Sequence, residues 1–379
     1  MKTQFVLLLL LTALLPRAAL AQNCPARSVP TAGWTSRAQT IKTTHTSAVA
    51  DLDAYMFTLT GKPEDRVGRR SNGLLVIHHG VILYEKYANG FGPDTRHITW
   101  SVTKSFTNAL TGIAVREGRL SVDDSICVHY PAAPKEACDV TIKHLLMMGS
   151  GFDWLETYEA ERPANSSVLA MLYGVGSDDM AFMVANEPKR DAPGTTWMYS
   201  SGDSVLLSRV VANALQPHHG EYYPWATLFD RIGAKNVTWE RDGSGTFVGS
   251  SYVYATPRDM ARFGLLYLHD GCWGTERILP EGWVTQSAAV NEAFKLKPIT
   301  DDPTDVYGWQ FWLNAAVPEQ SIAQPFPDVP ADMFAARGHW GQSITMIPSL
   351  DLVVVRVGDD RDGSTDFNEL LKRAIALTR

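Results

Sequence analysis

The chain has 379 residues, 45% of them hydrophobic and 20% charged, which is enough for one large globular domain or two modest ones. Its formal net charge is −7. An acidic chain is a poor partner for nucleic acid or anionic lipid, and no run of like charge indicates an interaction tail.

The N-terminal residues 1–21 have the pattern of a secretory signal peptide. A short basic start is followed by an apolar run over residues 5–15 and by Ala19-Leu20-Ala21, an A-x-A cleavage pattern. A single membrane anchor is the alternative, but this run is short for a bilayer span. Cleavage would remove two basic residues and no acidic one, so the charge of −7 would become −9. We therefore expect a periplasmic or secreted mature chain, 22–379, without a membrane span.

Four cysteines fit an oxidising compartment, because an even count there suggests disulfides. Cys127 and Cys138 would close a short loop, and this pairing is favoured. Cys24 and Cys272 are what remains. The alternative is that some of the four are plain buried thiols.

The first predicted elements after the signal peptide are an arm, a helix and a hairpin. Residues 22–50 are polar and indicate an arm along the surface. Residues 51–62 have apolar side chains at helical spacing. Residues 74–88 predict a β-hairpin, because apolar and β-branched residues flank His79-Gly80.

Helices dominate the middle of the chain. A helix that begins at Ser101 should end at Gly118. Further helices are predicted at 141–151, 166–174, 178–187, 201–215 and 256–271.

The C-terminal part predicts two strands joined by a turn within 343–360 and a last amphipathic helix over 366–379. The sequence therefore predicts an α/β (α+β) fold. Its antiparallel sheet would be built from both chain ends, about 35–100 and 250–379, around a helical region of about 101–249.

Ser101 and Lys104 form an S-x-x-K string at the start of a predicted helix. Such a string is weak alone, since Ser is also a common helix N-cap. If the helix begins at Ser101, Lys104 lies one turn later on the same face. The positive helix N-terminus and partial desolvation would both lower the pKa of this Lys, and a neutral amine beside a hydroxyl can act as a base.

Two further segments carry candidate chemistry. Tyr199 lies in a loop before a predicted helix, where a phenol can relay a proton, although it could equally be a half-buried core aromatic. Residues 336–343, ARGHWGQS, lead into a strand, and a Gly-rich edge lets a substrate approach the backbone N–H groups.

Together, Ser101-Val102-Thr103-Lys104, Tyr199-Ser200-Ser201 and His339-Trp340-Gly341 resemble, in this order, the three signature motifs of the serine β-lactamase and penicillin-binding superfamily. The resemblance spans roughly residues 70 to 360 and is greatest to the class C-like branch. That branch includes β-lactamase-fold esterases and 6-aminohexanoate-dimer hydrolases. It implies a β-lactamase/transpeptidase-like fold.

The resemblance also implies a role for each matching residue. Ser101 would be the acylated nucleophile, Lys104 its proton partner, and Tyr199 an acid and base that protonates the leaving group. The N–H groups of Ser101 and Gln342 would form the oxyanion hole. The substrate would contact one residue of the second motif, Ser201, and the three residues of the third motif, His339, Trp340 and Gly341.

Two departures from the lactamase pattern favour a different substrate. The third motif is H-W-G, so His339 stands where lactamases carry Lys, and Ser201 replaces their Asn. Trp340 would add an apolar wall. We therefore expect an ester or linear-amide hydrolase that acts on a small molecule through an acyl-enzyme on Ser101. The alternative is a β-lactamase or D,D-peptidase.

Other classes fit less well. G-x-S-x-G and H-E-x-x-H do not occur, and the adjacent pairs His78-His79 and His218-His219 would point to opposite faces of a strand. We therefore expect neither a metal nor a cofactor. A catalytically inactive binding module on this fold stays possible, and the sequence leaves the oligomeric state open.

Overall fold

The computed structural model describes residues 24–59, 62, 64, 66–158, 165–300, 302 and 305–379. The signal peptide predicted for residues 1–21 lies outside these residues. Among the helices of the described ranges, none has the length and apolar character needed to cross a membrane.

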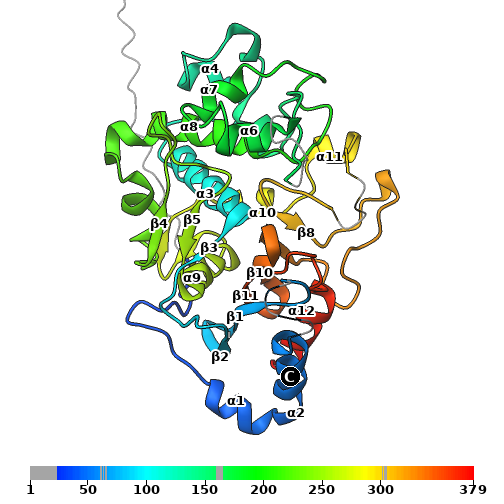
Figure 1. Cartoon of the computed structure of the whole chain (residues 1–379). Coiled ribbons are helices and arrows are strands. Elements are labelled where there is room, and N and C mark those ends of the chain that lie inside the picture. Colours follow the sequence, from blue (N-terminus) through cyan, green and yellow to red (C-terminus); the bar gives the residue numbers. More distant parts are fainter. Residues whose placement is uncertain are drawn as a thin grey trace, which may run out of the picture.

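The two ends of the chain share one antiparallel sheet of six strands, as the sequence predicts (Figure 1). Its order is β2-β1-β11-β10-β9-β8. The strands are β1 (Ser71–His78), β2 (Val81–Tyr87), β8 (Trp312–Leu313), β9 (Phe334–Gly338), β10 (Gln342–Ile347) and β11 (Leu352–Gly358). β1 pairs with β11, so residues about 280 positions apart lie side by side.

Strand β1 is buried on both faces of this sheet. Leu74 and Val76 pack with helices α2 (Thr46–Phe57) and α12 (Phe367–Ala376), whereas Leu75 and Ile77 join the larger core on the other face. Because successive side chains of a strand alternate between faces, a strand covered on both sides is a continuous apolar run. The sequence LLVI is such a run.

In Figure 1 most of the remaining helices lie above the six-stranded sheet, whereas α1 (Ala38–Thr44) lies below it, beside α2. The others are α3 (Thr103–Arg116), α4 (Ile126–His129), α5 (Ile142–Leu146), α6 (Ser167–Tyr173), α7 (Met180–Ala185), α8 (Ser201–His219), α9 (Pro257–Leu268), α10 (Trp283–Ser287) and α11 (Glu292–Leu296). Two small sheets complete the fold: β3 (His97–Ile98), β5 (Val253–Ala255) and β4 (Val237–Trp239), and β6 (Cys272–Trp273) with β7 (Glu276–Arg277).

Turn and disulfide predictions hold in the structure. His79 and Gly80 have φ angles of 51° and 72°, which a tight two-residue hairpin turn requires. Gly118, at φ 66°, follows the end of α3. Both predicted disulfides, Cys127–Cys138 and Cys24–Cys272, are present.

The arm predicted for residues 22–50 is wrong beyond residue 37, because α1 and the start of α2 are helical. Ile41 and Val49 are buried in the core beside α12. The stripe Val49, Leu52 and Met56 also places the second helix at 46–57 rather than 51–62.

Candidate active site

Ser101 lies in a 3₁₀ turn, Trp100–Val102, that leads directly into α3. The caps of this turn and of α3 are Thr99 and Val102, and neither makes a side-chain cap bond, so the interpretation of Ser101 as a helix N-cap is wrong. Lys104 lies in the first turn of α3, and its Nζ donates to Ser101 Oγ at 3.0 Å. The one-turn spacing therefore brings amine and alcohol together as expected.

The Lys104 amine is buried, with 1% of the residue exposed. Its Nζ also donates to Ser201 Oγ at 3.0 Å and to the Ser250 carbonyl at 3.2 Å. Burial lowers the pKa of Lys104 to about 8, and the nearby Glu156 carboxylate partly opposes this shift. An unprotonated amine is therefore accessible near neutral pH.

Tyr199 also lies near this amine, in the loop before α8. Its ring is stacked on Trp312 at 5.2 Å and lies 4.9 Å from Lys104 Nζ. Burial raises the pKa of the Tyr199 phenol well above its usual value, and Glu156 adds to the rise, although hydrogen bonding with Ser101 acts in the opposite direction. The phenol therefore keeps its proton at neutral pH and can donate it.

A carboxylate that sequence reasoning missed completes this polar network. Glu156 accepts from Ser201 Oγ at 2.6 Å, from the Ser201 N–H at 2.9 Å and from the Tyr158 hydroxyl at 2.6 Å. Glu156 Oε2 also accepts from Trp154 Nε1 at 2.6 Å. Glu156 comes from an irregular segment with no motif around it, so only its position at the N-terminus of α8 marks it.

Ser201 has a different position from the one predicted. It is fully buried and joins Lys104 to Glu156, and it is absent from the described residues that line the cavity beside Ser101. The structure thus places Ser201 in the hydrogen-bond network of Lys104 and Glu156 and not in the described lining of the cavity.

The segment 336–343 approaches Ser101 through a different glycine from the one in the predicted third motif. A Cβ on Gly338, the last residue of β9, would overlap the Thr99 carbonyl and lie 3.2 Å from the Ser101 nitrogen. Gly341 is instead packed against Arg356. The glycine beside Ser101 is therefore Gly338, whereas Gly341 lies against Arg356.

The residue that follows the glycine beside Ser101 is therefore His339 and not Gln342, whose N–H was predicted as an oxyanion donor. Gln342 is fully buried in β10, and its side chain donates to the His339 carbonyl at 3.0 Å. Trp340 packs edge-on against Trp100 at 5.3 Å. Of this segment, His339 does reach the cavity, where its ring stacks on Tyr158 at 5.0 Å.

The cavity beside Ser101 has a volume of about 610 Å³. Its walls are rich in aromatic side chains, and three charged side chains, Glu156, Asp305 and Arg337, lie among them. Burial raises the pKa of Asp305 to about 6. The described residues that line it are Ser101, Trp154, Leu155, Glu156, Tyr158, Trp197, Met198, Tyr199, Ile299, Thr300, Asp305, Trp312, Arg337, Gly338 and His339.

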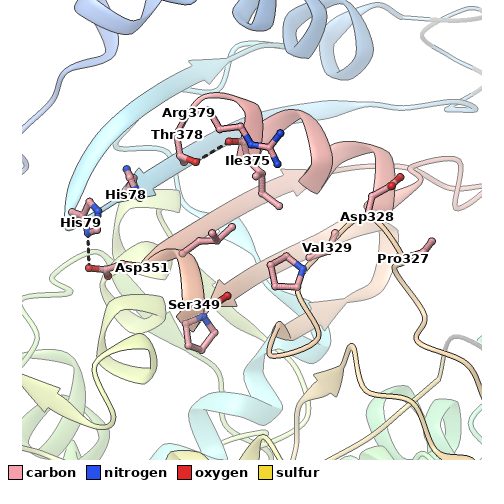
Figure 2. Close-up of a pocket in the computed structure, with 13 residues that line it drawn as sticks. His78, His79, Pro327, Asp328, Val329, Ser349, Asp351, Ile375, Thr378 and Arg379 are labelled. Carbon is pink, nitrogen blue, oxygen red and sulfur yellow. Dashed lines mark hydrogen bonds and ion pairs between the residues drawn. The ribbon is translucent and has the colours of Figure 1, made fainter.

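A second cavity, of about 690 Å³, lies at the opposite end of the sheet strands (Figure 2). It is lined by the β1–β2 turn and the end of α12, and His79 Nδ1 pairs there with Asp351 Oδ2 at 2.8 Å. It contains no residue of the Ser101 network, so the smaller cavity is the candidate active site.

Comparison with known proteins identifies the family. The Beta-lactamase family model matches residues 49–378. This chain therefore belongs to the Beta-lactamase family, has the β-lactamase/transpeptidase-like fold, and is a serine hydrolase.

Individual relatives agree with this class. The chain is 25% identical over 342 residues to the 6-aminohexanoate-dimer hydrolase of Paenarthrobacter ureafaciens, covering 87% of this chain and 83% of the relative. Among solved structures, EstCE1, a hydrolase with promiscuous acyltransferase activity, has a TM-score of 0.63 at 14% identity, covering 89% of this chain and 100% of its own. A penicillin binding protein from Bacillus halodurans has a TM-score of 0.60 at 18% identity, covering 81% and 96%.

Proposed function

We propose that the protein hydrolyses an ester or a linear amide through an acyl-enzyme on Ser101. The observation that carries this proposal is the Lys104 amine, buried and 3.0 Å from Ser101 Oγ, with a pKa lowered to about 8. A general base works best when its pKa is close to the operating pH.

In this mechanism the neutral Lys104 amine takes the proton of Ser101 as Oγ attacks the substrate carbonyl. The Tyr199 phenol, whose pKa is raised by burial, supplies a proton to the departing alcohol or amine. A water molecule then attacks the acyl-enzyme, with the same groups acting in reverse, and releases Ser101.

The oxyanion would be held by the N–H of Ser101 and the N–H of His339. His339 follows Gly338, the residue of β9 that lies against the Ser101 backbone, and it lines the cavity. Donors aimed at the developing negative charge commonly provide the largest single contribution to catalysis of acyl transfer.

The aromatic walls of the cavity suit an acyl chain or an extended aliphatic amide. The relative named 6-aminohexanoate-dimer hydrolase supports the linear-amide form of this proposal. The two disulfides and the N-terminal sequence support a secreted or periplasmic location.

The test compares turnover of a short-chain p-nitrophenyl ester, a linear aminoacyl amide and nitrocefin, together with labelling by a fluorophosphonate probe. We expect ester or amide turnover to exceed nitrocefin turnover, and the probe to label Ser101. Faster nitrocefin hydrolysis would instead favour a penicillin-recognising enzyme, and an unlabelled Ser101 would indicate an inactive binding module.

A further inference from the structure

The hairpin turn that joins β9 to β10 directly follows Gly338, the residue of the sheet that lies against the backbone of Ser101. Its residues are His339–Gly341. Trp340 in this turn has a φ of 58°, in the left-handed region that a bulky side chain rarely adopts, and Gly341 follows at φ 84°. Such a backbone persists only where its surroundings hold it.

Each carbonyl of this turn accepts a hydrogen bond from β10, from β11 or from the residues that directly follow β11. The Gly341 carbonyl accepts from Arg356 Nη1 at 2.7 Å, and the Trp340 carbonyl accepts from the Asp360 N–H at 3.2 Å. The Gln342 side chain donates to the carbonyls of His339, at 3.0 Å, and Trp340, at 3.3 Å. The turn is thus fixed from the end of β11 and the start of β10.

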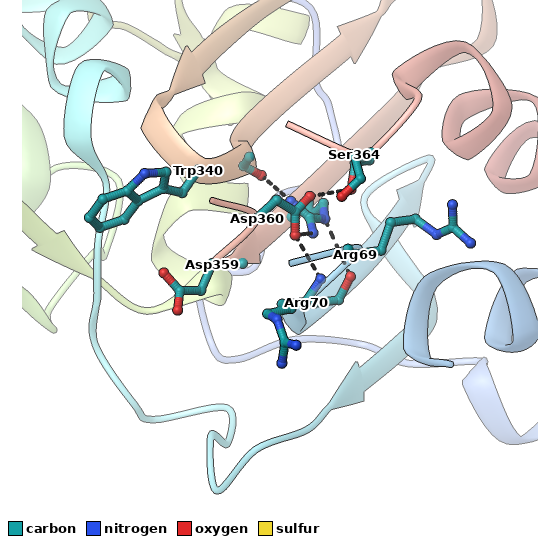
Figure 3. Close-up of polar contacts among 12 residues, drawn as sticks. Arg69, Arg70, Trp340, Asp359, Asp360 and Ser364 are labelled. Atoms are coloured by element: carbon teal, nitrogen blue, oxygen red, sulfur yellow. Dashed lines mark hydrogen bonds and ion pairs between the residues drawn. The ribbon is translucent and has the colours of Figure 1, made fainter. Parts of the chain in front are cut away.

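The central donor, Arg356, belongs to a buried ion pair. Arg356 and Asp360 side chains are 0% and 1% exposed, and Nη2 donates to Asp360 Oδ1 at 2.6 Å. The same oxygen accepts from the Arg70 N–H at 2.7 Å, and Asp360 also accepts from the Thr365 hydroxyl. Figure 3 shows Asp360 at the centre of these contacts, with Trp340 nearby.

The fit around the guanidinium is close. A Cβ added at Gly341 would overlap Arg356 Nη1, and one at Gly358 would lie 2.7 Å from it. Arg361 lies over the Trp340 ring, 3.3 Å from its centroid, and restrains the turn from its solvent side. Burying a charged pair is costly, and removing one partner is strongly destabilising, so the pair fixes one arrangement of its neighbours.

We infer that the Arg356–Asp360 pair is the positioning device of the oxyanion hole. By holding the Gly341 carbonyl, it sets where the His339 N–H lies relative to Ser101. Arg356 does not act on substrate, because it is fully buried and is absent from the described lining of the Ser101 cavity. Gln342 supports the same turn from within β10. This inference rests on the proposed function, because it assigns residues to the same acyl transfer.

The test uses a double variant, Arg356→Met with Asp360→Asn, which removes both buried charges together and deprives the Gly341 carbonyl of its donor. The measured quantity is the rate constant for fluorophosphonate labelling of Ser101, normalised to the labelled fraction at completion. We expect this rate constant and kcat for the ester to fall about 10- to 100-fold, the scale of a misplacement near 1 Å. KM and the final labelled fraction should stay close to wild type.

The matched control is Arg258→Met with Glu85→Gln. This pair is bidentate, at 2.7 and 2.9 Å, and it joins β2 to α9 away from the turn. We expect its labelling rate constant to match wild type even where the free energy of unfolding falls. Arg356→Lys, which keeps the charge but has a shorter reach, is the second variant and should label at an intermediate rate.

The outcomes separate this inference from the proposed function. Wild-type protein that is not labelled contradicts the proposed function itself. If wild type is labelled and the double variant or Arg356→Lys reacts at the wild-type rate, only the inference is wrong. A lower final labelled fraction with an unchanged rate constant also overturns it, because the pair would then affect folding alone.

Discussion

The two sides of Ser101 are built from different kinds of groups. On the helical side, the contacts are made by side chains: Lys104, Tyr199 and the Ser201–Glu156 pair form one polar network around Ser101. On the sheet side, at Gly338, the contact with the nucleophile is made by backbone. In the proposed mechanism, proton transfer therefore depends on the identity of residues, whereas stabilisation of the oxyanion depends on the geometry of a turn.

The largest expected effect is on the helical side. Lys104→Met should leave Ser101 without its base and lower kcat/KM for ester hydrolysis by about 10²–10⁴-fold, the usual range for positioned proton transfer. Steady-state kinetics and the fluorophosphonate labelling rate measure this. Ser101→Ala is the reference for complete loss, since it should fold and remain unlabelled. Near-full activity of Lys104→Met would break the pairing of amine and alcohol.

Tyr199→Phe tests whether the second group of this network acts as an acid. An amine leaving group needs a proton, whereas p-nitrophenolate leaves readily without one. We therefore expect kcat for a linear amide to fall by about 10²–10⁴-fold and kcat for the p-nitrophenyl ester to fall much less. Equal losses on both substrates would instead assign Tyr199 to the activation of Ser101.

The sheet side is tested by Gly338→Ala. The added Cβ would overlap the Thr99 carbonyl and crowd the Ser101 N–H, so the nucleophile and the strand must separate. We expect kcat to fall about 100-fold, with a small change in KM. Gly92→Ala is the control, because its nearest neighbour would lie 3.9 Å from the new Cβ. Wild-type kcat in Gly338→Ala would show that this close approach is not needed for catalysis.

The same contrast explains what the sequence could predict. Ser101 and Lys104 lie one helical turn apart, and helix geometry is regular enough to bring them together from spacing alone. The sequence also predicts that both chain ends contribute strands to one sheet, because their apolar runs belong to strands covered on two faces. The sequence could not predict which glycine lies beside Ser101, since Gly338 and Gly341 are three positions apart and either could end the strand. The turn after Gly338 depends on Trp340, which has a left-handed backbone conformation. Turn preferences would not place a left-handed residue at a tryptophan.

Glu156 could not be found in the sequence for a related reason. It lies in an irregular segment, and its role depends on where the N-terminus of α8 comes to lie. Its contacts with Ser201 join two segments that lie 45 residues apart in the chain, and their approach is a property of the packed protein. A single acidic residue in a loop is otherwise a common surface feature.

The smallest expected effect, a shift in pH dependence, tests that carboxylate. Burial lowers the pKa of Lys104 to about 8, and the Glu156 charge raises it against that effect. In the proposed mechanism activity requires the neutral amine, so the rate should rise with pH through this pKa. Glu156→Gln removes the opposing charge and retains a similar shape. We therefore expect the acidic limb of the kcat/KM profile to move to lower pH, with only a few-fold change in the plateau.

Asp305→Asn separates this effect from a general change in the charge of the cavity. Asp305 lines the same cavity, and burial raises its pKa to about 6, but it is not among the groups that shift the pKa of Lys104. Its removal should leave the limb near pH 8 in place. If Glu156→Gln left that limb unmoved while Asp305→Asn displaced it, the limb would belong to Asp305, and the helical side would not set the proton affinity of the site.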